Sequence, residues 1–254
     1  KGGSEMVRAF LFFLLVMVGS PHAGEPEIIK PQDFVTVSKN VSASMSGTEK
    51  KVREAAVRVR TPDQPGHGSG SLVNYKGLQF VFTAEHVVDD PHTAIYIVEK
   101  YGVQKLGVLV YADPIHDIAL LYLPEKFNNI EGIKFEPYSR VLEVGEEVTF
   151  SGFPSSHQLM TVRGRVAGYE VIKPGGTQMV IHTYGWFGSS GSAVYTAKGK
   201  LAGILWGIDL EYPSGDTPQI IEDMMWVVPI KNLKIEKAVE MVCENFNTGL
   251  RACK

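Results

Sequence analysis

The chain has 254 residues, of which 44% are hydrophobic and 21% are charged, and its formal net charge is -3. This composition is typical of a globular protein that is long enough for one large core or two small ones. Lysine and arginine are neither in excess nor clustered, so we expect no nucleic-acid partner. The 26 glycines and 14 prolines favour many turns and short strands over long helices.

Residues 1–24 are predicted to form a targeting segment. Arg8 precedes an apolar run at 9–18, and small residues follow that run. This pattern is typical of a signal peptide, and the run is shorter than the roughly 20 apolar residues of a membrane helix. We therefore expect a secreted or periplasmic protein, or a membrane-associated one if the segment is not cleaved. Residues 1–5 are either added residues, an extension from a start assigned upstream of Met6, or the cut end of a longer polyprotein.

Residues 25–50 are polar and rich in serine, which predicts a linker with at most one short strand. Asn40-Val41-Ser42 is a formal N-glycosylation sequence, which matters only in a eukaryotic secretory pathway. Two cysteines, Cys243 and Cys253, lie near the end of the chain. They either close one small loop or remain free thiols. No Cys/His spacing resembles a zinc site, so we expect no metal and no cofactor.

Residues 51–135 contain short apolar runs separated by turn-forming residues. The runs predict strands at 55–59, 71–74, 78–83, 94–98, 102–111 and 118–123. His86 comes directly after one of these strands, where a fixed base could border a cleft. Asp117 comes directly before another, and it is either a turn residue or the partner of a charged group.

Residues 136–245 repeat this organisation after a polar connector at 124–138. Strands are expected near 144–154, 160–167, 178–183, 192–196, 201–208 and 225–230. Helical spacing follows at 231–245, and 246–254 form a tail. About six short strands in each half predict an all-β fold of two antiparallel six-stranded barrels with a C-terminal helix.

A glycine-rich stretch at 185–193 places Ser190 at its centre. Gly188 and Gly191 permit a tight turn from which a hydroxyl projects while backbone N–H groups point the same way. A serine nucleophile also needs a base and an acid that orients the base. All seven histidines precede Ser190, which excludes the α/β-hydrolase order and leaves the order His, Asp, Ser.

Three motifs occur in one order along the chain: Thr83-Ala-Glu-His86, Asp117-Ile-Ala-Leu-Leu and Gly188-Ser-Ser-Gly-Ser-Ala193. With these motifs the chain resembles the trypsin-like, chymotrypsin-fold serine proteases over about 51–245. It looks closest to compact bacterial, phage and viral members and to Deg-type protease domains. The resemblance implies a serine endopeptidase with a polypeptide substrate and an acyl-enzyme intermediate.

The resemblance also implies residue roles. Ser190 would attack the scissile carbonyl, His86 would move its proton, and Asp117 would orient the imidazole. The N–H groups of Gly188 and Ser190 would form the oxyanion hole. The substrate-binding residues implied by position are Tyr184, Gly185, Trp186, Trp206 and Gly207. Tyr184 stands where trypsin-type enzymes hold an aspartate, which favours an apolar or aromatic P1 residue over arginine or lysine.

Two departures from the family pattern are Ser189, in place of Asp or Asn, and Ser192, in place of a second glycine. Without an aspartate at 189, activation by a freed N-terminus is not expected, and the folded chain should be competent. The alternatives are a catalytically silent binding module and a viral polyprotein-processing protease tethered to a membrane.

The remaining histidines are expected to be bystanders. His67 and His92 lie in loops without a motif, and His116 is expected to be an exposed turn residue. His182 lies on a predicted strand, either in the core or lining the substrate site.

Overall fold

The computed structural model describes residues 44–253 apart from 63, 129, 131, 138–139, 213–216, 247–248 and 250–252. The predicted targeting segment, most of the predicted linker and the Asn40 sequence therefore lie outside the described residues. Within the part that is described, no helix is both long and apolar enough to cross a membrane.

The first barrel is built from the strands β1 (Ala56–Arg60), β2 (Gly68–Tyr75), β3 (Leu78–Thr83), β4 (Ile95–Lys100), β5 (Val103–Asp113) and β6 (Ile118–Tyr122). Their order is β1-β4-β5-β6-β3-β2, and an antiparallel β1–β2 pairing closes the barrel. A two-residue strand, β7 (Ile133–Lys134), adds to β2 in parallel. Buried side chains such as Leu72, Val81 and Leu121 fill the interior.

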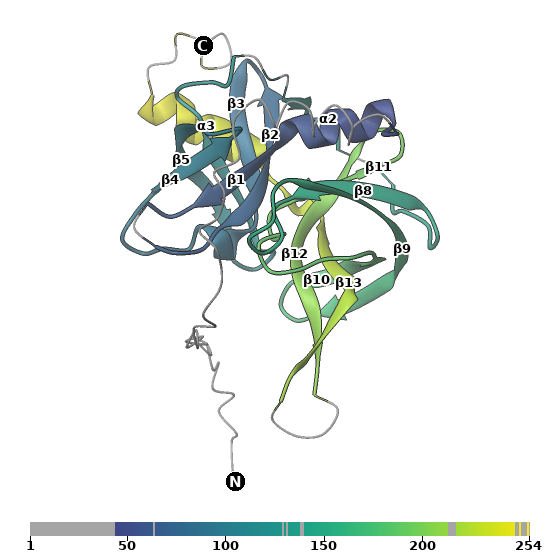
Figure 1. Cartoon of the computed structure of the whole chain (residues 1–254). Coiled ribbons are helices and arrows are strands. Elements are labelled where there is room, and N and C mark those ends of the chain that lie inside the picture. The colour runs from purple at the N-terminus through teal and green to yellow at the C-terminus, as the bar shows by residue number, and fades with distance from the viewer. Residues whose placement is uncertain are drawn as a thin grey trace, which may run out of the picture. The chain divides into compact units, whose positions relative to one another are not determined.

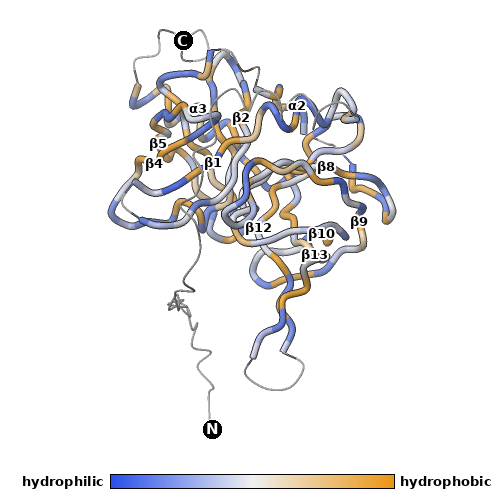
Figure 2. The backbone as a smooth tube through the Cα atoms, in the orientation of Figure 1, coloured by the Kyte–Doolittle hydropathy of each residue, from blue (hydrophilic) through white to orange (hydrophobic). Residues whose placement is uncertain are grey.

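The second barrel is built from β8 (Glu147–Gly152), β9 (Met160–Ile172), β10 (Gly176–His182), β11 (Ala193–Thr196), β12 (Leu201–Glu211) and β13 (Gln219–Pro229). It closes in the order β10-β13-β12-β11-β8-β9. The predicted fold class, two antiparallel six-stranded barrels, is therefore confirmed (Figure 1). In Figure 2 the hydrophobic stretches lie mainly along the strands of both barrels, as burial of one strand face requires.

An unpredicted helix, α2 (Gly47–Ala55), precedes the first strand. The expectation of a linker to residue 50 is wrong at residues 47–50, and the strand predicted at 55–59 begins at Ala56, after the helix. Ser46 and Glu49 form a capping box, in which each side chain accepts a hydrogen bond from the backbone N–H of the other. This box satisfies N–H groups that the first helical turn leaves unpaired, so a polar segment can begin a helix here.

Helix α2 contacts both barrels (Figure 1). On the second barrel, Glu49 forms an ion pair with Arg163 of β9, and Arg53 donates a hydrogen bond of 2.9 Å to the carbonyl of Leu159. On the first, the buried amine of Lys100 in β4 donates a hydrogen bond of 3.2 Å to the carbonyl of Arg53, within the helix. Helix α2 therefore links the two barrels.

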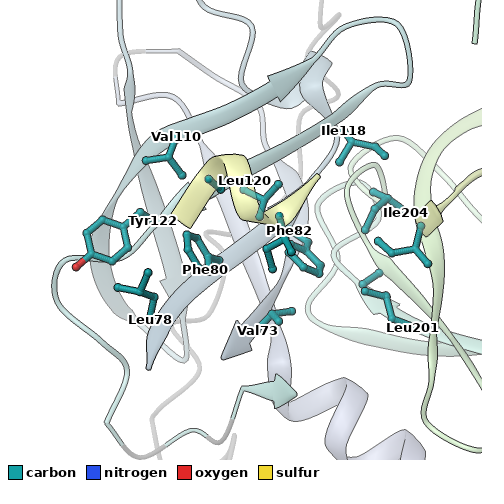
Figure 3. Packing of buried hydrophobic residues seen from close by; sticks show 14 of the residues in the cluster. Val73, Leu78, Phe80, Phe82, Val110, Ile118, Leu120, Tyr122, Leu201 and Ile204 are labelled. Atoms are coloured by element: carbon teal, nitrogen blue, oxygen red, sulfur yellow. The ribbon is translucent and has the colours of Figure 1, made fainter. Parts of the chain in front are cut away.

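The C-terminal helix α3 (Ile235–Asn245) begins later than the predicted 231 because residues 230–232 form a 3-10 turn. It follows the second barrel in sequence, yet Val239 and Val242 pack into a core that also contains Val110 and Tyr122 of the first barrel. Figure 3 shows that this core also takes in Leu201 and Ile204 of β12. The disulfide between Cys243 and Cys253 ties the tail to α3 and settles the open alternative in favour of pairing.

Candidate active site

The pairing of β3 with β6 brings His86 and Asp117 together. His86 lies in a 3-10 turn (Glu85–Val87) directly after β3, and Asp117 lies directly before β6. The two strands are antiparallel, with Thr83 opposite Ala119. The end of one strand and the start of the other therefore meet at the same edge of the first barrel.

Asp117 holds His86 through two hydrogen bonds. Its Oδ2 lies 2.7 Å from the Nδ1 of His86, and its Oδ1 accepts the His86 backbone N–H at 2.8 Å. Asp117 has a φ of 52°, a left-handed conformation that costs a non-glycine residue about 1–2 kcal/mol. A carboxylate only accepts, so Nδ1 carries the hydrogen and the neutral ring presents Nε2 as an acceptor.

The charge of Asp117 also changes the acidity of His86. Burial lowers the pKa of His86, but the hydrogen bond and the charge of Asp117 outweigh burial and raise that pKa above its usual value. The side chain of His86 is still 44% exposed, so the ring remains accessible. The arrangement favours the imidazolium that forms when this base takes up a proton.

The turn around Ser190 requires its two glycines. Gly188 and Gly191 have φ values of 92° and 89°. A Cβ added at Gly188 would lie 2.5 Å from the carbonyl oxygen of Phe153, and one at Gly191 would collide with the carbonyl oxygen of Ser69. Only glycine fits both the backbone conformation and the space.

The Ser190 hydroxyl donates a hydrogen bond to the carbonyl of Trp206 at 3.2 Å. Among the described hydrogen bonds it has none to His86, so the structure joins His86 to Asp117 but leaves the serine directed elsewhere. The Ser190 backbone nevertheless contacts the first barrel, because its carbonyl accepts the N–H of Ser69 at 2.7 Å.

Two backbone N–H groups of the turn remain available. Those of Gly188 and Ser190 donate to no acceptor in the described part of the chain, whereas that of Ser189 is used within the turn. The Phe187 carbonyl accepts the Ser155 N–H at 2.6 Å. Because the C=O and N–H of a trans peptide point in opposite directions, the Gly188 N–H points away from Ser155.

The family model of the trypsin-like peptidase domain matches residues 68–204, slightly more than half of the chain. The chain belongs to the trypsin-like peptidase family. It is therefore a serine peptidase, and a peptidase domain implies a polypeptide substrate. The comparison with curated proteins gave no match.

Solved structures support the fold of this peptidase. The Rv3671c protease from M. tuberculosis in its active form is 16% identical, with 73% of this chain and 80% of that chain covered and a TM-score of 0.57. Its inactive form is 16% identical, with 78% and 92% covered and a TM-score of 0.56. A serine endoprotease from Yersinia pestis is 22% identical, with 77% and 68% covered and a TM-score of 0.58.

The implied substrate-binding residues of the peptidase lie on two segments beside Ser190. Tyr184 is 41% exposed, Gly185 is buried, and Trp186 packs edge-on against Phe187 with ring centroids 5.8 Å apart. Trp206 meets Ser190 through its carbonyl. A residue that the sequence reasoning missed is Met225, whose thioether occupies the space where a Cβ on Gly185 would lie.

Gly207 pairs with Trp226 of β13 after a bulge at Trp206. A Cβ added at Gly207 would meet only the Trp226 Cβ, at 4.0 Å, so this side is open.

Two surface cavities lie on the first barrel. Leu78 and Phe127 line one of them, and Lys100 and Phe127 line the other. Leu78 is at the end of β3 opposite His86, so these cavities are separate from the candidate site.

Two other histidines, His116 and His182, each lie within ion-pair distance of an aspartate. His116 is half-buried rather than exposed, and its Nδ1 lies 2.8 Å from Oδ2 of Asp113. His182 is exposed, with Nε2 3.3 Å from Oδ2 of Asp223, so its alternative placement in the core is wrong. The described residues contain no cluster of three His, Cys, Asp or Glu side chains that could hold a metal ion.

Two further residues that sequence reasoning left without a role contact the Ser190 turn from the first barrel. Ser69 donates its hydroxyl to the carbonyl of Gly188 at 2.7 Å and accepts the N–H of Phe153 at 2.9 Å. The Nε2 of His67 lies 2.8 Å from the carbonyl oxygen of Phe153. The one available signal was the Gly68-Ser69-Gly70 run, whose small residues permit close approach of another backbone.

Proposed function

We propose that this serine peptidase is an endopeptidase that works through His86, Asp117 and Ser190 and forms an acyl-enzyme. The observation that carries the proposal is the hydrogen bond of 2.7 Å between His86 and Asp117, which leaves Nε2 free to accept a proton. Two unpaired N–H groups beside Ser190 support it, since a tetrahedral intermediate needs donors there.

In the proposed reaction, the Ser190 hydroxyl first turns from the Trp206 carbonyl towards His86. A single neutral hydrogen bond is worth about 1 kcal/mol net, so this rotation is cheap. The Ser190 oxygen then bonds to the scissile carbon while His86 Nε2 takes its proton. The carbonyl oxygen becomes an oxyanion that accepts hydrogen bonds from Gly188 and Ser190.

Collapse of this intermediate breaks the bond to the leaving nitrogen, which receives the proton from His86. The product is an ester between the substrate acyl group and Ser190. Water then attacks that ester, with His86 again taking a proton and returning it to Ser190. The carboxylate of Asp117 stabilises each imidazolium.

We further propose an apolar or aromatic P1 preference. Tyr184 and Trp186, six and four residues before Ser190, support this preference, because both are aromatic and neither carries a negative charge that would attract lysine or arginine. A library of peptides that differ only at P1 tests this. Preferential cleavage after lysine or arginine would contradict it.

We propose that the protein is secreted or periplasmic. The pattern of residues 1–24 and the Cys243–Cys253 disulfide support this, because disulfides persist in oxidising compartments. Intact mass of the mature chain tests it: loss of a segment ending between Ser20 and Gly24 is expected. Retention of the apolar run in a membrane fraction would favour the tethered alternative.

Labelling with a fluorophosphonate tests the catalytic proposal. We expect an adduct on Ser190 that disappears in Ser190→Ala and is strongly reduced in His86→Ala. Ser156→Ala is the matched control. It removes the exposed hydroxyl of a serine in the loop after β8, and the variant should label normally. A folded wild type without an adduct would favour the silent binding module.

A further inference from the structure

We infer that His67 is a positioning residue that fixes the oxyanion-binding turn through the carbonyl of Phe153. The inference rests on the proposed function, because it assigns His67 to the N–H group of Gly188. His67 belongs to the first barrel, directly before β2, whereas Phe153 and Gly188 belong to the second. The residue therefore acts across the barrel interface.

The hydrogen bond defines what His67 contributes. Its Nε2 lies 2.8 Å from the Phe153 carbonyl oxygen. A carbonyl only accepts, so Nε2 carries the hydrogen and His67 is the donor. Phe153 itself is 8% exposed, so this carbonyl belongs to a largely buried residue. Loss of the donor would leave the oxygen without this partner in a place where water has poor access.

Gly188 rests directly against this hydrogen bond. A Cβ added at Gly188 would lie 2.5 Å from the Phe153 oxygen, 3.0 Å from His67 Nε2 and 3.3 Å from the N–H nitrogen of Ser155. The three atoms form a wall behind the Gly188 backbone. Two of these atoms, the Phe153 oxygen and His67 Nε2, are joined by the hydrogen bond. The geometry of that bond therefore determines where the atoms behind Gly188 lie.

The same wall fixes the direction of the Gly188 N–H. The Ser155 N–H donates to the Phe187 carbonyl at 2.6 Å, which orients the peptide that carries the Gly188 nitrogen. Ser155 has a φ of 50°, which is unfavourable for a serine and needs neighbouring contacts to persist. His67 supplies such a contact two residues earlier, at Phe153. Movement of this loop would therefore turn the Gly188 N–H.

His67 acts as a neutral donor in this arrangement. Burial lowers the pKa of His67, the bond to Phe153 opposes that change, and the charge of Arg58 lowers the pKa further. The Arg58 guanidinium lies 4.8 Å from the centre of the Phe153 ring, on the same cluster. A neutral ring suits the role, because a single N–H at Nε2 is all that the Phe153 carbonyl requires.

The test compares two variants that differ in the donor. His67→Phe keeps a ring without a donor, and His67→Gln keeps a side-chain N–H. We expect His67→Phe to lower kcat about 10- to 100-fold with KM within about twofold, since misplacement near the reacting atoms costs up to roughly that much. His67→Gln should recover most of the loss. The same pair of changes at the exposed His92 is the control and should alter neither constant.

Two further readouts separate this inference from the proposed function. Active-site titration with a fluorophosphonate normalises kcat to folded, competent enzyme, so partial unfolding of His67→Phe does not imitate the effect. The amide NMR signal of Gly188 needs no turnover, and it should shift in His67→Phe and return towards the wild-type position in His67→Gln. Equal kcat losses in both variants, or an unmoved Gly188 signal, would overturn the inference even if Ser190 remains the nucleophile. A missing Ser190 adduct with the expected Gly188 shifts would overturn the proposed function alone.

Discussion

The two barrels fix their parts of the candidate site in different ways. The first barrel holds His86 by side-chain contacts within itself, because one strand pairing places Asp117 beside it. The Ser190 turn of the second barrel is held by its backbone, and two of its carbonyls, those of Gly188 and Ser190, accept hydrogen bonds from Ser69 of the first barrel. The base is thus fixed locally, whereas the nucleophile turn depends on how the barrels meet.

Asp117→Asn disrupts the His86–Asp117 pair within the first barrel and should have the largest effect. An amide cannot hold the Nδ1–H tautomer as the carboxylate does, so we expect kcat to fall about 10³- to 10⁴-fold, the order known for such triads. Steady-state kinetics on a peptide ester measure it. Asp113→Asn is the control, because Asp113 contacts Tyr111, Ile115 and His116 but has no hydrogen bond to His86 among those described, and it should leave kcat within about twofold.

The pH dependence of activity also tests the His86–Asp117 pair. Activity needs neutral His86, whose pKa is raised above its usual value, so activity should be lost as pH falls through a pKa above about 6.5. The acid limb of a kcat/KM profile reports this pKa. In Asp117→Asn the limb should move to lower pH. A wild-type limb below pH 6 would contradict the assignment.

Ser69→Ala tests the contacts that hold the Ser190 turn at the interface between the barrels. It removes a buried hydroxyl that serves both Gly188 and Phe153, so we expect a loss of about 1–3 kcal/mol in the free energy of unfolding. The change should also lower kcat. Ser192→Ala is the stability control, because the buried Ser192 hydroxyl has no partner among the described residues. Equal destabilisation by both variants would refute the bridging role of Ser69.

Glu49→Gln tests the ion pair that joins α2 to the second barrel, and it should have the smallest effect. The hydrogen bonds from Arg163 lower the pKa of Glu49 to about 2. Arg163 is 56% exposed, so solvent screening reduces the contribution to about 1 kcal/mol. The lowered pKa stabilises the fold above pH 4.5, and this stability is lost as pH falls towards 2.

Urea unfolding should therefore separate wild type from Glu49→Gln at pH 7 and bring them together near pH 2. Glu244→Gln, at an exposed position of α3, is the control and should match wild type throughout. A gap that stays constant across this pH range would show that the carboxylate charge of Glu49 is not the source of the difference.

The sequence predicted the barrels because strand alternation and glycine turns are local signals. It also predicted the candidates His86 and Asp117, which one strand pairing then brought together. It did not predict α2, since a polar linker composition concealed the Ser46–Glu49 capping box. The contact of His67 with Phe153 spans 86 positions and ends on a backbone carbonyl, so no residue type marks it.

The docking of α3 shows the same limit. Its apolar side is visible in the sequence, but nothing in that pattern names the first barrel as its partner. The direction of the Ser190 hydroxyl is equally invisible, because it depends on a rotation about one bond. Local pattern determines elements, and contacts between distant elements determine the fine geometry of the site.

The most direct test of the central claim, that His86 and Ser190 from the two barrels act as one unit, is the kcat of the double variant His86→Ala/Ser190→Ala. Residues that act as a unit give non-additive losses. We predict that the double variant is no slower than Ser190→Ala alone. Losses that multiply would contradict the account, because each residue would then act without the other.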